Sequence, residues 1–241
     1  RVYDGRKEFR LAEEYYLKAS EIAYDQVGPD HALYQQIQSN IGILYMSNQR
    51  LEEAEEVFLR VLGIRKALYG TMHRLTLKTF NSLGVCKSLQ GNTDEASEIL
   101  EATASMQSEL LGPGHNDTLI TQANLADCFQ KAGKLPQAET LLKAVLESTI
   151  NQYGEVQEQT INTLMALTDV LTQMEKPDEA VSYYDFAIRL QQAFYGEQHP
   201  ITGLTRYKRA RLKISQNLWN NDDISDFIRW SLYKASQCNE S

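Results

Sequence analysis

The four histidines are the side chains best suited to hold a metal ion, but their spacing argues against that role. They lie at positions that differ by whole multiples of 42 residues, namely His31, His73, His115 and His199. In stacked helical repeats, equivalent loops are separated by about 10 Å. The ligands of one zinc ion must all lie about 2 Å from the metal. We therefore predict a structural role for the histidines, no metal site and no cofactor.

No other set of side chains suits catalysis. The sequence has no glycine-rich phosphate loop, no Gly-x-Ser-x-Gly elbow and no His-Glu-x-x-His motif. Cys86 and Cys128 lie one repeat apart at equivalent positions, which is too far for a disulfide and suits apolar packing. Cys238 is expected to be a free thiol. Without a convergent set of acids and nucleophiles, we predict that the chain is not an enzyme.

The charge balance narrows the classes of partner. The formal net charge is -8 and the isoelectric point is about 5.1, which opposes binding to nucleic-acid phosphates. No apolar run approaches the roughly 18 residues of a membrane span, and three cysteines are too few for a disulfide framework. We expect a cytoplasmic protein with no membrane, nucleic-acid or small-molecule partner. Because the chain begins at Arg1 without a methionine, we also expect a fragment of a longer protein.

Three series of residues recur every 42 positions and predict an internal repeat. One series consists of glycines that follow an apolar or aromatic residue: Gly28, Gly70, Gly112, Gly154 and Gly196. The second consists of alanines: Ala12, Ala54, Ala96, Ala138 and Ala180. The third consists of small residues: Gly42, Gly84, Ala126, Thr168 and Ala210. Small residues are needed where two helices touch, because axes about 8 to 10 Å apart leave little room for side chains.

Within one period the pattern predicts a helix, a short turn and a second helix. Apolar residues of 119–129 follow helical spacing, Gly133 interrupts them, and 135–146 resume an i, i+3, i+4, i+7 stripe. Pro136 begins the second helix, where a missing N–H costs little. The periodic glycine is expected to end that helix as a left-handed cap. One hairpin cannot bury its apolar face alone, so the hairpins must stack.

These residues resemble the tetratricopeptide repeat (TPR). Leu83-Gly84 followed by Ala96 and Leu100 is similar to the TPR pattern over its two helices. The 42-residue period and the segment 122–126, Gln-Ala-Asn-Leu-Ala, resemble the kinesin-light-chain variety. The segment 115–125 is also similar to the C-terminal repeats of fungal NLR-type receptors. The resemblance covers roughly residues 1–215 and implies an all-α, right-handed superhelical solenoid.

The repeat register predicts one continuous TPR solenoid over residues 1–216 and a C-terminal capping helix with a tail over 217–241. The first repeat is partial, with a turn between the end of a first helix near Tyr3 and a second helix over 8–26. Four complete hairpins are expected at about 35–68, 77–110, 119–152 and 161–194, followed by a fifth first helix at 203–216. In the cap, one apolar stripe of Ile224, Phe227, Ile228 and Leu232 is expected to cover the last repeat, with Trp219 and Trp230 in the cap packing.

The resemblance implies that the first helices of the hairpins line a concave groove that binds a peptide segment of a partner protein. Mapping the repeat pattern onto the sequence assigns the following residues to that groove: Gln36, Ser39, Asn40, Ile43, Lys78, Asn81, Val85, Ser88, Ile120, Asn124, Asp127, Gln130, Asn162, Met165, Asp169, Tyr207 and Arg211. Asparagines recur in this set, and an amide can both donate to and accept from a peptide backbone. The alternative is that these amides are merely solvated.

Two further alternatives stay open at the level of the sequence. A basic cluster at Arg206, Lys208, Arg209, Arg211 and Lys213 either docks an acidic partner or forms internal ion pairs. The chain is either a protein-binding adaptor or scaffold, or the sensing or self-associating repeat arm of a larger NLR-type or signalling receptor.

Overall fold

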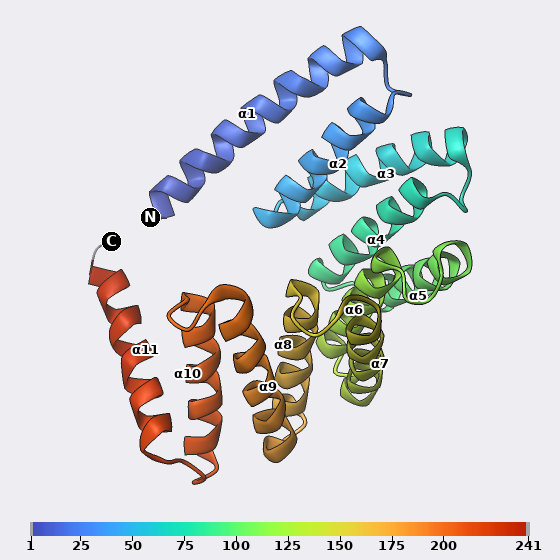
Figure 1. Ribbon diagram of the computed structural model, residues 1–241. Helices are drawn as coiled ribbons and strands as arrows, with labels where there is room; N and C mark the ends of the chain where they lie inside the picture. Colours follow the sequence, from blue (N-terminus) through green and yellow to red (C-terminus); the bar gives the residue numbers. More distant parts are fainter. Residues whose placement is uncertain (1, 240–241) are drawn as a thin grey trace. The chain divides into compact units, whose positions relative to one another are not determined.

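The computed structural model describes residues 2–239, with side chains from residue 8 to residue 233, and its regular elements are all α-helices. The predicted all-α class is confirmed (Figure 1). The helices are α1 (Val2–Val27), α2 (Ala32–Ser47), α3 (Leu51–Tyr69), α4 (Arg74–Leu89), α5 (Thr93–Leu111), α6 (Asn116–Lys131), α7 (Leu135–Tyr153), α8 (Glu158–Gln173), α9 (Pro177–Tyr195), α10 (Pro200–Ser215) and α11 (Asn221–Asn239). None of these described helices is long and apolar enough to cross a membrane. The side chain of Cys238 lies outside the described set.

The helices are grouped in two compact units, Arg1–Ala132 and Gly133–Ser241. Within the first unit each helix from α1 to α6 packs against the next one along the chain, and within the second the same holds from α7 to α11 (Figure 1). Each unit is therefore a stack of helices built from consecutive hairpins. The single solenoid over residues 1–216 stays a prediction.

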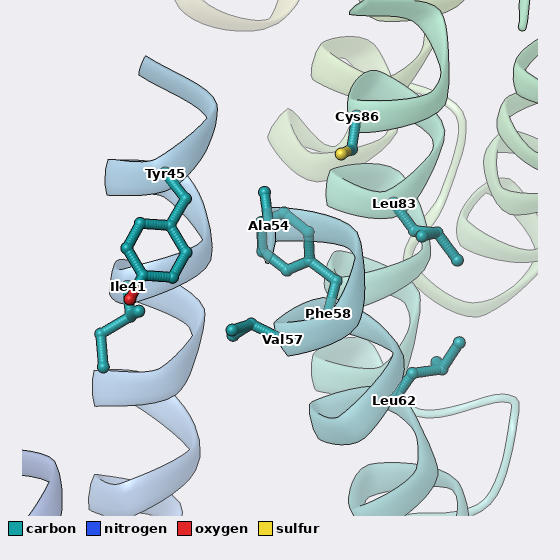
Figure 2. Close-up of a cluster of buried hydrophobic side chains, with 8 residues drawn as sticks. All are labelled: Ile41, Tyr45, Ala54, Val57, Phe58, Leu62, Leu83 and Cys86. Carbon is teal, nitrogen blue, oxygen red and sulfur yellow. The ribbon is translucent and has the colours of Figure 1, made fainter. Parts of the chain in front are cut away.

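A buried cluster in the first unit explains the need for small residues. Ile41 and Tyr45 of α2 and Phe58 of α3 are at most 8% exposed and belong to one cluster, to which α4 adds Leu83 (Figure 2). A Cβ atom on Gly42 of α2 would lie 2.6 Å from Cε1 of Phe58. The ring of Phe58 therefore occupies the space that a side chain at position 42 would need.

A histidine caps the N-terminus of four of the five first helices. These helices begin three residues earlier than predicted, at 32, 74, 116, 158 and 200 instead of 35, 77, 119, 161 and 203. In four of them a histidine Nδ1 accepts a hydrogen bond from the backbone N–H two residues later, at 3.1 to 3.3 Å: His31, His73, His115 and His199. In α8 the same position is Gln157, whose side chain forms no cap. The histidines thus stabilise helix N-termini.

The periodic glycines end the second helices with a positive φ, but not in the left-handed helical conformation that was predicted. Gly70, Gly112, Gly154 and Gly196 combine φ of 81° to 99° with ψ of 153° to 174°. This region is accessible essentially only to glycine. A threonine six residues later donates its hydroxyl hydrogen to each glycine carbonyl at 2.8 to 3.2 Å: Thr76, Thr118, Thr160 and Thr202. Each glycine and its threonine define one loop conformation.

The predicted turn near the start of the chain is absent. Helix α1 runs unbroken from Val2 to Val27, through the positions where a turn between two helices was expected. Gly5, the residue best suited to that turn, lies inside the helix. A single glycine costs a helix interior only about 1 kcal/mol relative to alanine, so it does not by itself enforce a break.

Helix α11 packs on α10 through Phe227 of the predicted stripe and through Trp230, as predicted, but not through the whole of that stripe. Phe227 stacks on Tyr207 of α10 with ring centroids 5.2 Å apart, and a Cβ on Gly203 would touch the ring of Trp230 at 3.3 Å. Ile228 and Leu232 of the predicted stripe are 50% and 66% exposed. Outside this contact, Trp219 is 47% exposed, so its predicted place in the cap packing is wrong.

Candidate peptide-binding site

The candidate site in the first unit lies along α2, α4 and α6. These are the first helices of successive hairpins, and α2 contacts α4 while α4 contacts α6. First helices that touch each other across repeats lie on the inner side of the stack, because there the repeats are closest together. Side chains on this side of the three helices can therefore act together on one extended ligand.

One hydrogen bond joins asparagines of two neighbouring repeats. Nδ2 of Asn124 on α6 donates to Oδ1 of Asn81 on α4 at 2.9 Å, and both residues are half-buried. They are 43 residues apart, one more than the repeat period. Within the described residues, the Asn81 Nδ2 donates no hydrogen bond and the Asn124 Oδ1 accepts none. The pair therefore presents a donor and an acceptor beside each other.

The four asparagines of the predicted groove set, Asn40, Asn81, Asn124 and Asn162, occupy three different positions of the repeat. Asn40 and Asn124 are two periods apart and do share a position, whereas Asn81 stands one residue before it and Asn162 four residues before it. On α2, the exposed Gln36 donates from Nε2 to Oδ1 of Asn40 at 3.0 Å. The amides therefore form two hydrogen-bonded pairs in the first unit, not one aligned ladder.

An ion-paired group on the same two helices as Asn81 and Asn124 was missed by the sequence analysis. Asp117 of α6 is 5% exposed and accepts a hydrogen bond from Nε of Arg74 at 2.6 Å, and Nζ of Lys78 lies 3.4 Å from its other oxygen. Burial opposes ionisation of this carboxyl, but the hydrogen bond from Arg74 and the charges of Lys78 and Arg74 outweigh it, so its pKa lies below the ordinary value. Arg74 and Asp117 are 43 residues apart, as are the two paired asparagines. This spacing is the feature of the sequence that could have indicated the ion pair.

Other predicted groove residues of the first unit are distributed around the amides. Ile43 is 50% exposed, and Val85 is half-buried. The hydroxyl of the half-buried Ser39 donates to the Gln35 carbonyl at 2.8 Å, so it is occupied by its own helix. Asp127 is exposed and lies 2.7 Å from Nζ of Lys131. Ser88 is only 4% exposed, so its assignment to an open groove was wrong.

The predicted residues of the second unit have separate environments. Asn162 and Arg211 are exposed. Asp169 lies 3.1 Å from Nζ of Lys208 and accepts from the Tyr184 hydroxyl at 3.4 Å, whereas Tyr207 is stacked on α11. Ion pairing and ring stacking therefore already involve two of these four side chains.

The basic cluster on α10 is mainly an internal ion-pair network. Arg206 pairs with Glu197, Lys208 with Asp169, and Lys213 with Asp223; Arg209 lies within ion-pair distance of Asp185, Asp223 and Asp226. Arg211 is the member that forms no ion pair within the described part of the chain. The alternative of internal pairing therefore accounts for four of the five cations.

The hairpin geometry, the 42-residue period and the small residues at helix crossings define an all-α solenoid of TPR hairpins. Residues 33–109 and 89–151 match the family model described as tetratricopeptide repeat. The chain therefore carries tetratricopeptide repeats, as its sequence resemblance indicated. No curated protein sequence matches it significantly.

Solved structures share this fold at low sequence identity. BtubC (BKLC) from P. vanneervenii is 18% identical with a TM-score of 0.77, and the match covers 96% of this chain and 91% of that one. TPR-like repeats described as a Podosopora anserina kinesin light chain are 21% identical with a TM-score of 0.62, covering 80% and 92%. YrrB, described as a TPR protein with an unusual peptide-binding site, is 14% identical with a TM-score of 0.52, covering 88% and 92%.

Proposed function

We propose that the chain is a protein-interaction module, acting as an adaptor or scaffold, and that α2, α4 and α6 bind an extended peptide segment of a partner protein. The observation that carries the proposal is the hydrogen-bonded pair Asn81 and Asn124, which bridges two repeats and keeps one donor and one acceptor available. A peptide backbone needs one of each per residue. The pair therefore matches a main chain and not a particular side chain.

The groups around the pair supply the other requirements of peptide binding. Ile43 and Ile120 are 50% and 39% exposed and offer apolar contact to an anchor side chain. Arg74 and Lys78 are both exposed at about half of their side-chain surface while their charges are held beside Asp117. A fixed geometry of polar groups lowers the entropy cost of binding, because little has to be ordered when the ligand arrives.

Solved structures that share this fold support the proposal of a protein-interaction module. YrrB is described as having a peptide-binding site. The TPR fold serves many unrelated assemblies, so the fold supports protein binding in general while the residues of this chain must determine the partner.

The test is a selection from a random peptide display library followed by calorimetry on the selected peptides. The double variant Asn81→Ala/Asn124→Ala should weaken binding of groove-selected peptides at least about tenfold, since two backbone hydrogen bonds are lost at about 1 kcal/mol each. The matched control, Glu98→Ala/Glu101→Ala, changes exposed residues of α5, which is a second helix and lies off this surface. Circular dichroism should show equal helicity in all three proteins.

Peptides that bind the double variant as tightly as the unchanged chain would refute the groove assignment. Weakening by the α5 control but not by the asparagine variant would move the binding surface to the second helices.

A further inference from the structure

A pocket of about 150 Å³ lies in the second unit, between the N-terminal end of α10 and the C-terminal half of α11. Its lining includes Glu197 from the preceding loop, Gly203 and Arg206 from α10, and Arg229, Trp230 and Tyr233 from α11. The residues of the candidate peptide groove do not line it. The pocket is therefore a feature separate from the proposed peptide site.

Comparison with the other hairpins shows how this interface differs from theirs. Gly203 corresponds by the 42-residue period to Gln35, Leu77 and Ile161, which are at most 1% exposed and fill the space between the two helices of their hairpins. The facing position on the second helix of these hairpins is also buried: Arg65, Gln107 and Gln191 are at most 4% exposed. The residue at this position in α11, Tyr233, is 41% exposed. At Gly203 the ring of Trp230 takes the place of such a side chain, and the pocket lies beside this contact.

The lining also carries a charge where the equivalent position of other hairpins is uncharged. Arg229 corresponds by the period to Val61, Thr103, Val145 and Ala187, all of which are fully buried. A terminal cap needs polar residues only on its outer face. Arg229 is exposed and lines the pocket, so its charge is accessible to a ligand there.

The balance of charges selects an anionic ligand. Nη2 of Arg206 lies 3.3 Å from Oε1 of Glu197, whose side chain is 68% exposed, so a competing carboxylate can replace this weak pair. Asp226 lies 3.3 Å from Arg209, which also lies 2.6 Å from Asp185 and 3.4 Å from Asp223. Arg229 is exposed and forms no ion pair within the described residues. One cation of the lining is therefore uncompensated, and a second is compensated only by a solvent-exposed acid.

We propose that this pocket binds the carboxylate of a glutamate or aspartate side chain from a partner polypeptide. The carboxylate lies between Arg206 and Arg229, whose guanidinium groups favour planar, two-oxygen ligands, and its methylene groups contact the ring of Trp230. Glu197 occupies Arg206 in the free protein and is displaced on binding. The proposal does not depend on the groove formed by α2, α4 and α6.

Tryptophan fluorescence provides a direct readout, because the chain has two tryptophans and only Trp230 lines the pocket. In a Trp219→Phe background, the probe is acetyl-Gly-Glu-Gly-amide and the matched control is acetyl-Gly-Gln-Gly-amide. We expect a saturable change with the glutamate peptide and none with the glutamine peptide. Arg229→Gln should weaken binding at least about tenfold, whereas Arg189→Gln, an exposed change on α9 outside the pocket, should leave it unchanged.

Three results would overturn the proposal. The first is a glutamate peptide that produces no saturable change, and the second is equal binding of the two peptides. The third is binding that Arg229→Gln does not affect; because Arg229 is exposed, this variant should keep its helicity, which circular dichroism verifies. Glutarate is titrated in parallel, and saturation by glutarate without binding of the peptide would reject a polypeptide as the source of the carboxylate.

Discussion

Alanine substitutions at two helical glycines of the first unit should change stability in opposite directions. Gly42 in α2 and Gly63 in α3 both lie inside helices, and replacing glycine by alanine in a helix interior gains about 1 kcal/mol of helix propensity. At Gly63 an added Cβ meets no atom within 4 Å. At Gly42 it would lie 2.6 and 2.7 Å from two ring carbons of Phe58, which is fully buried. The first change should stabilise the protein, and the second should force a shift in the packing.

The size of the difference follows from these contacts. Overpacking a core by one carbon costs about 1 to 3 kcal/mol, so Gly42→Ala should lower the free energy of unfolding by about 1 kcal/mol after the propensity gain. Gly63→Ala should raise it by about 1 kcal/mol. Urea denaturation followed by circular dichroism measures both changes. The same substitution in a Phe58→Ala background identifies the cause. The ring is absent there, so Gly42→Ala should raise the free energy of unfolding, as Gly63→Ala does in the unchanged chain.

Equal stabilisation by the two substitutions would refute this reasoning, because it would mean that the α2 and α3 backbones separate at no cost. A destabilising effect of Gly42→Ala that persists in the Phe58→Ala background would show that the ring is not the obstacle.

Three further predictions concern single side chains. His73→Ala should lower the free energy of unfolding by about 1 kcal/mol in urea denaturation because α4 loses its N-terminal cap, whereas His73→Asn should retain most of it. The lowered pKa of Asp117 adds stability above the unfolded pKa that is lost as the pH falls below about 4, so acid titration of Asp117→Asn should show a shallower loss than the unchanged chain; equal slopes would exclude the ion pair as the cause. In a Cys238→Ser variant, Cys86 should resist alkylation by iodoacetamide at pH 8 until urea unfolds the chain, because burial raises the pKa of its thiol to about 11 and excludes the reagent; rapid native labelling would contradict this.

The period and the small residues carried most of the information about the hairpins. Gly42 and Gly84 recur because large side chains of the facing helices, Phe58 and Leu100, pack directly against them. The need for a small residue at such a crossing can be recognised in the sequence as a glycine at a fixed position of the repeat. The first helices were predicted three residues too short, because the three residues after each capping histidine, and after Gln157 before α8, were assigned to the loop. The predicted turn near Tyr3 rested on periodicity, and the sequence there contains no proline that would force a break.

The site could be predicted only in part, because contacts between repeats do not follow the repeat period. Asn81 and Asn124, like Arg74 and Asp117, are separated by 43 residues and not by 42. Aligning the repeats places residues in equivalent positions, but neighbours across two helices are displaced by one residue. The sequence therefore indicated amides as residue types of the candidate site, but it did not indicate their pairing. The ion pairs of Arg209 were equally hidden, because they depend on how α10 and α11 are rotated about their axes.

The hydrogen bond between each of these glycines and its threonine fixes the length of the loop that connects two hairpins. Because the glycine carbonyl accepts from a threonine six residues later, an inserted or deleted residue between them would break that hydrogen bond and rotate the next helix by about 100°, one step of an α-helix. A change of length in any of these four loops would therefore put the buried faces of neighbouring helices out of phase. Variation in binding must then arise by substitution on a fixed frame, as Gly203 and Arg229 illustrate in the last hairpin.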